Sequence, residues 1–219
     1  MRINRFIATT TGMSRRAADT VIADGRVLVN GTPVSMGKEI LENDRITLDG
    51  KHLTLQVTQT ILFNKPVGYV TSRNGQGSKT IYDLLPANLH ALKPVGRLDK
   101  DSSGLLLLTN DGNLAQQLTH PSFHKIKRYE TRLDKPLQPL HRQMIQDIGM
   151  QLGDGPSKLI LDRLKEGDDT QWQVTMHEGR NRQIRRTFEA LGYTVKRLHR
   201  TQFDQWHLDT LQPGKFKTV

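Results

Sequence analysis

Residues 96–112, with the sequence GRLDKDSSGLLLLTNDG, decide the fold that the rest of the chain must fit. Four consecutive leucines at 105–108 lie between Gly104 and Asn110. A short apolar run bounded by turn residues is typical of a strand that is buried on both faces of a sheet. Asp99 lies in the polar turn just before this strand, where a rigid scaffold can hold a reactive carboxylate in place. Asp99 is therefore the first candidate for a catalytic residue.

The composition favours a polyanionic partner. The 219 residues carry a formal net charge of +10, with 32 lysines and arginines against 22 aspartates and glutamates. Such an excess most often serves nucleic acid, although composition alone leaves open an ordinary basic protein. The absence of cysteine from the sequence excludes disulfides, thiolate nucleophiles and zinc ribbons, and it is typical of a reducing compartment. With neither a signal peptide nor an apolar run long enough to span a membrane, we expect a cytoplasmic protein.

Residues 1–57 are predicted to form a small separate domain. Ile3 and Phe6 share one face of a helix that ends at Gly12, and Ser14 is placed to cap a second helix. The inward face of that second helix is predicted to hold Ala17, Ala18, Val21 and Ile22. Residues 30–31, Asn-Gly, indicate a hairpin, and further strands are expected at 45–48 and 53–57 before a polar boundary at 56–59. The helical part carries a cluster of arginines: Arg2, Arg5, Arg15 and Arg16.

Residues 60–219 are predicted to form an α+β domain with a mixed, mostly antiparallel sheet, because strands and helices alternate irregularly along the chain. Strands are expected at 61–64, 68–72, 127–133, 159–161, 172–176 and 194–198. Asp111 is placed to cap a helix, and Pro139 starts another. The second of these helices has apolar residues at core spacing: Leu140, Met144, Ile145 and Ile148.

A second informative stretch, EGRNRQIRRTFEAL at 178–191, combines a core face with a row of cations. A helix starting at Asn181 directs Ile184 and Phe188 toward the core. The opposite face carries Arg182, Arg185 and Arg186, with Arg180 in the turn before it. Such a row suits phosphate binding or pairing with a carboxylate, and a solvated charged face is the alternative.

Two other chemistries are less well supported by the residues. Asp99 and Asp101 have the D-x-D spacing that holds a divalent cation in phosphoryl-transfer sites, but such sites usually need a third carboxylate. The eight histidines are scattered and show no HxH or HExxH spacing. A glycosidase needs two convergent carboxylates. We therefore expect no metal ion at this site and keep a metal-dependent phosphodiesterase as an open alternative.

These segments together resemble the RsuA family of pseudouridine synthases. The matching motifs are NKPVGYVTS at 64–72, the GRLD stretch at 96–112, KRYET at 127–131 and EGRNRQIRR at 178–186. The stretch SRRAADTVIADGRVLVNG at 14–31 resembles the alpha-L RNA-binding motif, which that family carries before its catalytic domain. The resemblance implies isomerisation of uridine to pseudouridine in ribosomal RNA without a cofactor, and the wording of the motifs favours the large-subunit RNA.

The resemblance also implies a role for individual residues. Asp99 would start the reaction, either by attacking the nucleoside or by removing a ribose proton. Tyr129 would lie against the target uracil, and Ile184 would pack beneath it. Arg185 would form a salt bridge with Asp99. Arg97 would fill the gap that a flipped nucleotide leaves in the RNA stack.

The remaining arginines are expected to bind RNA phosphates. They are Arg2, Arg5, Arg15, Arg16, Arg180, Arg182 and Arg186. We expect a monomer whose partner is ribosomal RNA or a pre-ribosomal particle, with no membrane partner. A non-catalytic RNA-binding assembly factor on the same fold is the main alternative. The presence of Asp99, Tyr129 and Arg185 together favours the enzyme, because a protein that only binds RNA has no need of all three.

Overall fold

The computed structural model describes residues 1–54 and 57–219. Residues 1–54, here called the N-terminal unit, contain two helices and a small sheet with the strand order β2-β1-β3-β4. The elements are α1 (Ile3–Thr11), α2 (Arg15–Ala23), β1 (Val27–Val29), β2 (Thr32–Pro33), β3 (Ile46–Leu48) and β4 (Lys51–His52). Their apolar side chains form one cluster of their own, which includes Ile3, Phe6, Ile22 and Ile46.

Local signals in the N-terminal unit are confirmed at most positions. Gly12 ends α1 with a φ of +77°, and the Ser14 side chain accepts a hydrogen bond from the Ala17 amide at the start of α2. Residues 30 and 31 both have positive φ, as the turn between β1 and β2 requires. Ala17, expected to face inward, is exposed, because it lies one position outside the face that Ala18 and Ile22 bury.

The last strand of the N-terminal unit differs from the prediction. It covers β4 (Lys51–His52), paired with β3, instead of residues 53–57. The turn at residues 49–50 explains the difference. Asp49 and Gly50 both take positive φ, so the chain reverses there and pairs with β3 from Lys51 onward. Two residues of the predicted strand, 55 and 56, and the first residue of the predicted boundary lie outside the described part of the chain.

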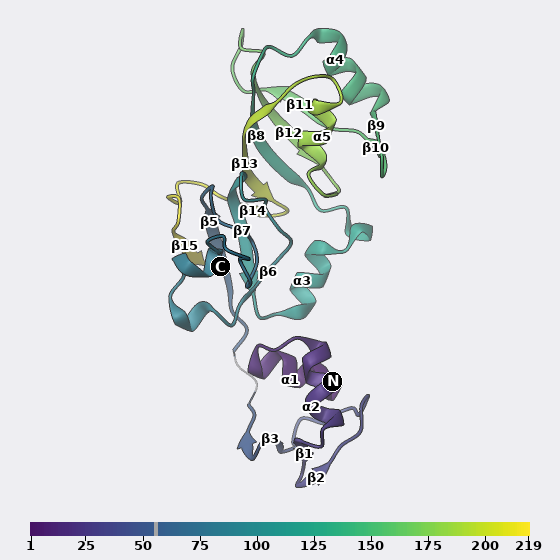
Figure 1. Ribbon diagram of the computed structural model, residues 1–219, viewed down its shortest axis with the longest axis vertical. Helices are drawn as coiled ribbons and strands as arrows, with labels where there is room; N and C mark the ends of the chain where they lie inside the picture. The colour runs from purple at the N-terminus through teal and green to yellow at the C-terminus, as the bar shows by residue number, and fades with distance from the viewer. Residues whose placement is uncertain (55–56) are drawn as a thin grey trace.

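Residues 57–219, here called the C-terminal unit, are built on one long mixed sheet (Figure 1). Its strand order is β11-β12-β8-β13-β7-β5-β15. The β7–β13 pair is parallel and the other ladders described for this sheet are antiparallel, so the predicted mixed, mostly antiparallel sheet is confirmed. The strands are β5 (Thr60–Lys65), β6 (Lys93–Pro94), β7 (Ser103–Thr109), β8 (Lys127–Leu133), β11 (Ile160–Arg163), β12 (Gln171–Met176), β13 (Val195–Phe203), β14 (Trp206–His207) and β15 (Phe216–Thr218).

The helices of the C-terminal unit lie around this sheet. They are α3 (Gly112–Thr119), α4 (Pro139–Gln143), which continues as a π-helical turn (Met144–Ile148), and α5 (Gln183–Glu189). Short 3-10 helices cover Ile81–Leu84, Ala87–Leu89 and Pro121–Phe123, and a separate hairpin is formed by β9 (Met150–Leu152) and β10 (Gly155–Ser157). None of the helices in the described chain combines the length and apolar character needed to cross a bilayer.

The leucine run of β7 is buried on both faces, as predicted. Leu106 and Leu108 pack into the larger core cluster, whereas Leu105 and Leu107 pack into a second cluster on the other side. All four side chains are fully buried. Complete burial of a leucine side chain contributes about 1.5–3 kcal/mol each, so this strand anchors the turn that precedes it.

Two expectations for the C-terminal unit are wrong. Residues 68–72 form no strand: their only bridge among the described residues joins Val70 to Thr80, because β7 and β15 already occupy both edges of β5. The helix from Pro139 buries only Ile145 fully, while Leu140 and Ile148 are 63% and 77% exposed. The change from α-helix to a π-helical turn at Met144 alters the helical period and explains the loss of a continuous apolar face.

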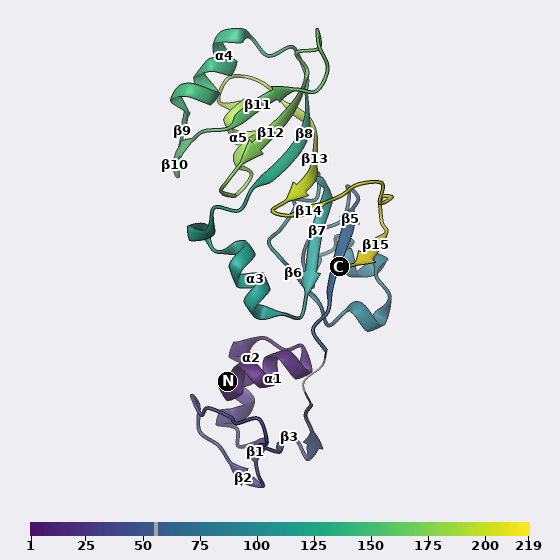
Figure 2. The ribbon, with the colours of Figure 1, turned by 180° about the vertical axis from the view of Figure 1, so that it is seen from behind.

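The N-terminal unit contacts α3 and β6 of the C-terminal unit. In both views α3 lies between the N-terminal helices and the upper half of the sheet (Figures 1 and 2). The Arg5 guanidinium donates to the side chain of Asn113 in α3, and the Lys93 ammonium donates to the Met13 carbonyl at 3.0 Å. These polar contacts place the arginine-bearing helices on the same side of the molecule as α3.

Candidate active site

A cavity of about 540 Å³ opens where the 96–102 turn, β8, β13 and the start of α5 meet. It brings together most of the expected catalytic residues: Arg97, Asp99, Tyr129 and Ile184 all line it, as do Arg180 and Arg182. Tyr129 and Ile184 are buried, whereas Arg97 is exposed at the rim. The volume lies in the range of small-ligand sites, and the lining combines apolar side chains with a few polar groups.

A buried lysine holds the turn that carries Asp99. Lys65 is the last residue of β5 and is fully buried. Its ammonium donates to the carbonyl oxygens of Pro66 at 3.1 Å, Asp99 at 2.9 Å and Ser102 at 2.7 Å. The Thr71 hydroxyl adds a hydrogen bond to the Leu98 carbonyl at 2.8 Å. The main chain on both sides of Asp99 is therefore fixed by donors from a distant segment.

Burial lowers the pKa of Lys65 to about 8, against the opposing attraction of Asp99 and Asp101. No role was predicted for Lys65 from the sequence. The sequence did hold a sign of this role, since Lys65 follows closely on an apolar stretch, residues 61–63, in the same strand. A lysine side chain is rarely buried completely unless hydrogen-bond acceptors or opposite charges surround its ammonium.

The carboxylate of Asp99 lies at the edge of the cavity and is 36% exposed. Its ion pair is with Arg182, whose Nη1 lies 3.6 Å from Oδ2. Arg182 takes a φ of +47° immediately before α5, and this bend directs its side chain back toward the turn. The same guanidinium also contacts Asp101 at 3.3 Å, so a cation already bridges the D-x-D pair.

The expected salt bridge between Arg185 and Asp99 is not among the ion pairs of the described residues. Arg185 instead contacts the Asp101 carboxylate at 3.3 Å and is only 10% exposed. It also donates to the Val195 carbonyl at 2.7 Å and to the Asp101 carbonyl at 3.0 Å. Arg185 therefore ties α5, β13 and the turn together, and Asp101 is one of its anchors.

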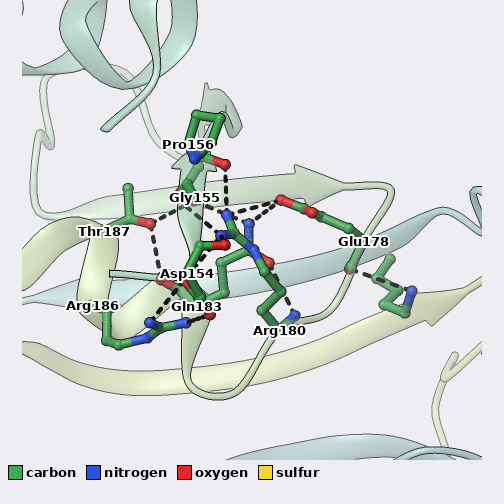
Figure 3. A network of polar contacts seen from close by, with 10 residues as sticks. Asp154, Gly155, Pro156, Glu178, Arg180, Gln183, Arg186 and Thr187 are labelled. Atoms are coloured by element: carbon green, nitrogen blue, oxygen red, sulfur yellow. Dashed lines mark hydrogen bonds and ion pairs between the residues drawn. The ribbon is translucent and has the colours of Figure 1, made fainter. Parts of the chain in front are cut away.

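Two arginines expected to face RNA are bound within the protein. Figure 3 shows Asp154, in the turn of the β9–β10 hairpin, between Arg180 and Arg186. Arg186 binds this carboxylate through both terminal nitrogens, at 3.0 and 2.7 Å, and Arg180 binds it at 2.9 Å. The hydrogen bond from Arg186 lowers the pKa of Asp154, with a further contribution from Arg180. These contacts come from a hairpin that lies 26 residues before Arg180 and 32 before Arg186 in the sequence, so helix periodicity alone does not reveal them.

The arginines of the N-terminal unit are differently placed. Arg15 and Arg16 are exposed in the first turn of α2, where positive charge opposes the helix dipole. Neither forms an ion pair within the described part of the chain. Arg2 is exposed just before α1, and Arg5 contacts Asn113 as described above. Two unpaired cations at an unfavourable helix end indicate a role outside the stability of the helix.

Arg200 and Lys127 are among the basic residues that line the cavity, and sequence reasoning missed both. Arg200 on β13 is 2% exposed and faces the cavity beside Tyr129. Lys127 on β8 donates to the Lys125 carbonyl at 3.3 Å and to the Glu178 carbonyl at 3.4 Å. Burial and the nearby charge of Arg200 lower the pKa of Lys127 to about 8. Within the described residues no group of three potential His, Cys, Asp or Glu ligands is close enough to hold a metal ion.

Both units of the chain match known families. Residues 59–190 match the RNA pseudouridylate synthase family, and residues 1–46 match the S4 domain family. The chain belongs to the RNA pseudouridylate synthase family, and it is therefore an isomerase that converts uridine to pseudouridine in RNA. The resemblance found in the sequence motifs is confirmed.

Relatives support this assignment over the whole chain. A crystal structure of a pseudouridylate synthase is 33% identical, with a TM-score of 0.71 over 100% of this chain and 96% of that one. The ribosomal large subunit pseudouridine synthase B of Bacillus subtilis is 36% identical, covering 97% of this chain and 89% of its own length. The ribosomal small subunit pseudouridine synthase A of Pasteurella multocida is 34% identical, covering 100% and 96%.

Proposed function

We propose that the enzyme isomerises a uridine of large-subunit ribosomal RNA and that Asp99 starts the reaction. The observation that carries this proposal is the position of the Asp99 carboxylate at the edge of a cavity whose walls include Tyr129 and Ile184. An aromatic ring and an aliphatic side chain offer flat apolar surfaces to a pyrimidine, while the carboxylate is open to the ribose. The relatives named as large-subunit enzymes support the choice of RNA.

Arg182 and Arg185 have different duties in this proposal. Arg182 aims the Asp99 carboxylate through the contact at 3.6 Å. Arg185 is a positioning residue, because it holds the backbone of the turn at Asp101 and does not line the cavity. Accurate placement of a reacting group contributes strongly to rate, so both are expected to act on turnover more than on RNA affinity.

The reaction is an internal rearrangement. The N1–C1′ bond of uridine breaks, the base turns within the cavity, and a C5–C1′ bond forms. The base must leave the RNA stack to reach the cavity, and Arg97 is suited to occupy the vacated position because it is exposed at the rim. No step requires a redox change or group transfer to another molecule, so we expect activity without a cofactor.

The N-terminal unit is proposed to be the RNA-binding domain, with residues 1–57 and 60–219 acting as separate domains. Support comes from the S4 match and from the unpaired charges of Arg15 and Arg16. Contacts to phosphates position a protein on RNA without reading its sequence. The enzyme is further proposed to act as a monomer in the cytoplasm, where ribosomal RNA is modified.

The first test is release of tritium from ribosomal RNA labelled at C5 of uracil, because C5 loses its hydrogen when it bonds to the ribose. Asp99→Asn should abolish release while RNA binding stays within about two-fold of wild type. Asp111→Asn is the matched control: asparagine caps a helix as well as aspartate, so the α3 cap is kept and activity should be unchanged. Turnover by Asp99→Asn at the wild-type rate would refute the proposed role.

The same assay separates the alternatives. A wild-type protein that binds ribosomal RNA but releases no tritium would be a non-catalytic assembly factor. Loss of activity in excess EDTA, with recovery on adding a divalent cation, would favour the metal-dependent alternative; we expect no loss. Mapping pseudouridines in a deletion strain identifies the target, and a missing pseudouridine in small-subunit RNA would overturn the large-subunit assignment.

A further inference from the structure

The guanidinium of Arg200 is buried in the cavity wall with part of its hydrogen-bonding capacity unused. Its Nε donates to the Leu105 carbonyl at 2.7 Å. Its Nη2 is buried and has no hydrogen-bond acceptor within residues 1–54 and 57–219. Buried polar atoms almost always have partners, because an unpaired one loses its hydrogen bonds to water without replacement. A molecule that enters the cavity can supply the missing acceptor.

The surroundings of Arg200 narrow the nature of that molecule. Arg200 is the cross-strand neighbour of Tyr129, and its guanidinium carbon lies 6.0 Å from the Tyr129 ring centre and 5.0 Å from that of Phe203. Leu198 and Met176 complete this part of the wall. An aromatic and aliphatic wall with one cationic donor favours a flat heterocycle that carries carbonyl oxygens.

We propose that Arg200 is a further catalytic residue, whose Nη2 donates a hydrogen bond to a carbonyl oxygen of the target uracil. This inference rests on the proposed function, since it assumes that the base enters this cavity. The contact strengthens when the base is detached from the ribose. Arg200 then stabilises the departing base, whether Asp99 starts the reaction by attacking the nucleoside or by removing a ribose proton.

The electron count explains why a guanidinium is useful there. When the N1–C1′ bond breaks, its electron pair leaves with the base, and the negative charge spreads over O2 and O4. Arginine remains protonated throughout, so it stabilises this anion without transferring a proton. After the base turns, the C5–C1′ bond forms, the C5 proton passes to water, and N1 takes up a proton. A donor whose interaction is stronger with the anion than with bound uridine accelerates the bond-breaking step.

A backbone phosphate is the competing occupant. Lys125 and Lys127 lie at the same side of the cavity, and phosphates are commonly bound by such cations. Burial argues against a phosphate at Arg200, because a residue that is 2% exposed is reached more readily by the edge of an inserted base than by the RNA backbone. The two occupants predict different substrate dependence.

The test uses the full-length enzyme and a short RNA that contains the uridine identified by mapping, prepared with uridine, 2-thiouridine or 4-thiouridine at that position. Sulfur accepts hydrogen bonds poorly. With wild-type enzyme, the single-turnover rate on one of the two thio substrates should be about 10- to 100-fold lower than on uridine. A loss of this size corresponds to one hydrogen bond to a charged group. Arg200→Lys should cause a similar loss with uridine and little additional loss with that thio substrate.

Arg197→Lys is the matched control, because Arg197 lies on the same strand but is 58% exposed and pairs with Glu130. It should react like wild type with all three substrates. The inference would be overturned if Arg200→Lys lowered the single-turnover rate by the same factor on uridine and on both thio substrates. A uniform loss of RNA affinity, with a salt slope reduced by about one, would assign Arg200 to a phosphate instead.

The wild-type rates test the inference even without a folded Arg200→Lys variant, and they separate it from the proposed function. If Arg200→Lys does not fold, as judged by circular dichroism, equal wild-type rates on the three substrates still overturn the inference. If wild type forms no pseudouridine in any RNA, the proposed function itself fails. If wild type is active but shows no coupling between Arg200 and a carbonyl, only the role of Arg200 fails.

Discussion

Replacing Gly104 with alanine is expected to lower the free energy of unfolding by about 4 kcal/mol. Gly104 lies in β7, opposite Arg200 of β13 in the parallel pair. Its φ of +105° is rarely adopted by residues with a side chain, and an added Cβ would approach the main-chain N, C and O atoms of Arg200 at less than 3.0 Å. The methyl group therefore meets main chain that cannot rotate away.

The magnitude has two parts. Holding a non-glycine residue in this backbone conformation costs about 1–3 kcal/mol. Overpacking against a rigid neighbour typically costs another 1–3 kcal/mol. Relief of the overlap requires β7 and β13 to move apart, which weakens the pairing at Ser103 and Gly104. A loss of this size is a large share of the 5–15 kcal/mol that stabilises most proteins.

Two matched glycines separate these contributions in urea or thermal unfolding. Gly192→Ala has a positive φ of +76° but no atom within 4 Å of the new Cβ, so it should cost only the backbone strain of about 1 kcal/mol. Gly112→Ala has neither problem and begins α3, where alanine should be neutral or slightly stabilising. A Gly104→Ala variant as stable as Gly192→Ala would refute the close approach of the two strands.

Three further predictions follow from charged groups. The pKa of Lys65 falls from 10.5 to about 8 on folding. Between these two pH values the Lys65 amine is therefore protonated in the unfolded chain and neutral in the folded one. The stability of wild type relative to Lys65→Met should thus rise by up to about 3 kcal/mol from pH 8 to 10.5; a constant difference would contradict it. Asp154→Ala should lower Tm by a few degrees at low salt and less at high salt, whereas an equal effect at both would argue against the ion pairs. Arg15→Ala combined with Arg16→Ala should reduce the salt slope of RNA binding by about two without changing single-turnover rate at saturation; an unchanged slope would count against RNA contact by α2.

Local sequence signals predicted the elements whose structure depends on near neighbours. The leucines at 105–108 form a buried strand, Ser14 caps a helix, and residues 30–31 turn a hairpin. Each of these depends on backbone preference or on periodicity within a few residues. The strand predicted at 68–72 does not form, because β7 and β15 occupy both edges of β5, and no pattern within a few residues reveals this.

The sequence predicted which residues line the candidate site better than it predicted their ion pairs. Motif resemblance identified Asp99, Tyr129 and Ile184, which line one cavity. The resemblance implied Arg185 as the partner of Asp99, whereas the structure pairs Asp99 with Arg182. Helix spacing identifies the cationic face of α5 but does not choose between these two arginines. That choice depends on the positive φ of Arg182 and on the carbonyl of Val195, both set by the tertiary fold.

The role of Asp154 shows the limit most clearly. A lone aspartate in a Gly-rich turn carries no local signal of an ion pair, yet it neutralises Arg186 in the folded chain. Arg200 was missed for a related reason. In the sequence it is one of many cations, and only burial beside Tyr129 distinguishes it.

The parallel pairing of β7 and β13 is also expected to determine when the enzyme becomes active during its synthesis. Across this pair of strands the Ser103 and His199 side chains bond over 96 positions of sequence. Contacts of such long range form late in folding. A nascent chain that ends at residue 190 already contains Asp99, Tyr129 and Ile184, but it lacks the strand that supplies Leu198 and Phe203 to the cavity wall. Uridine isomerisation is therefore expected only after translation has passed β13, so incomplete chains released from a stalled ribosome are inactive however many motifs they carry.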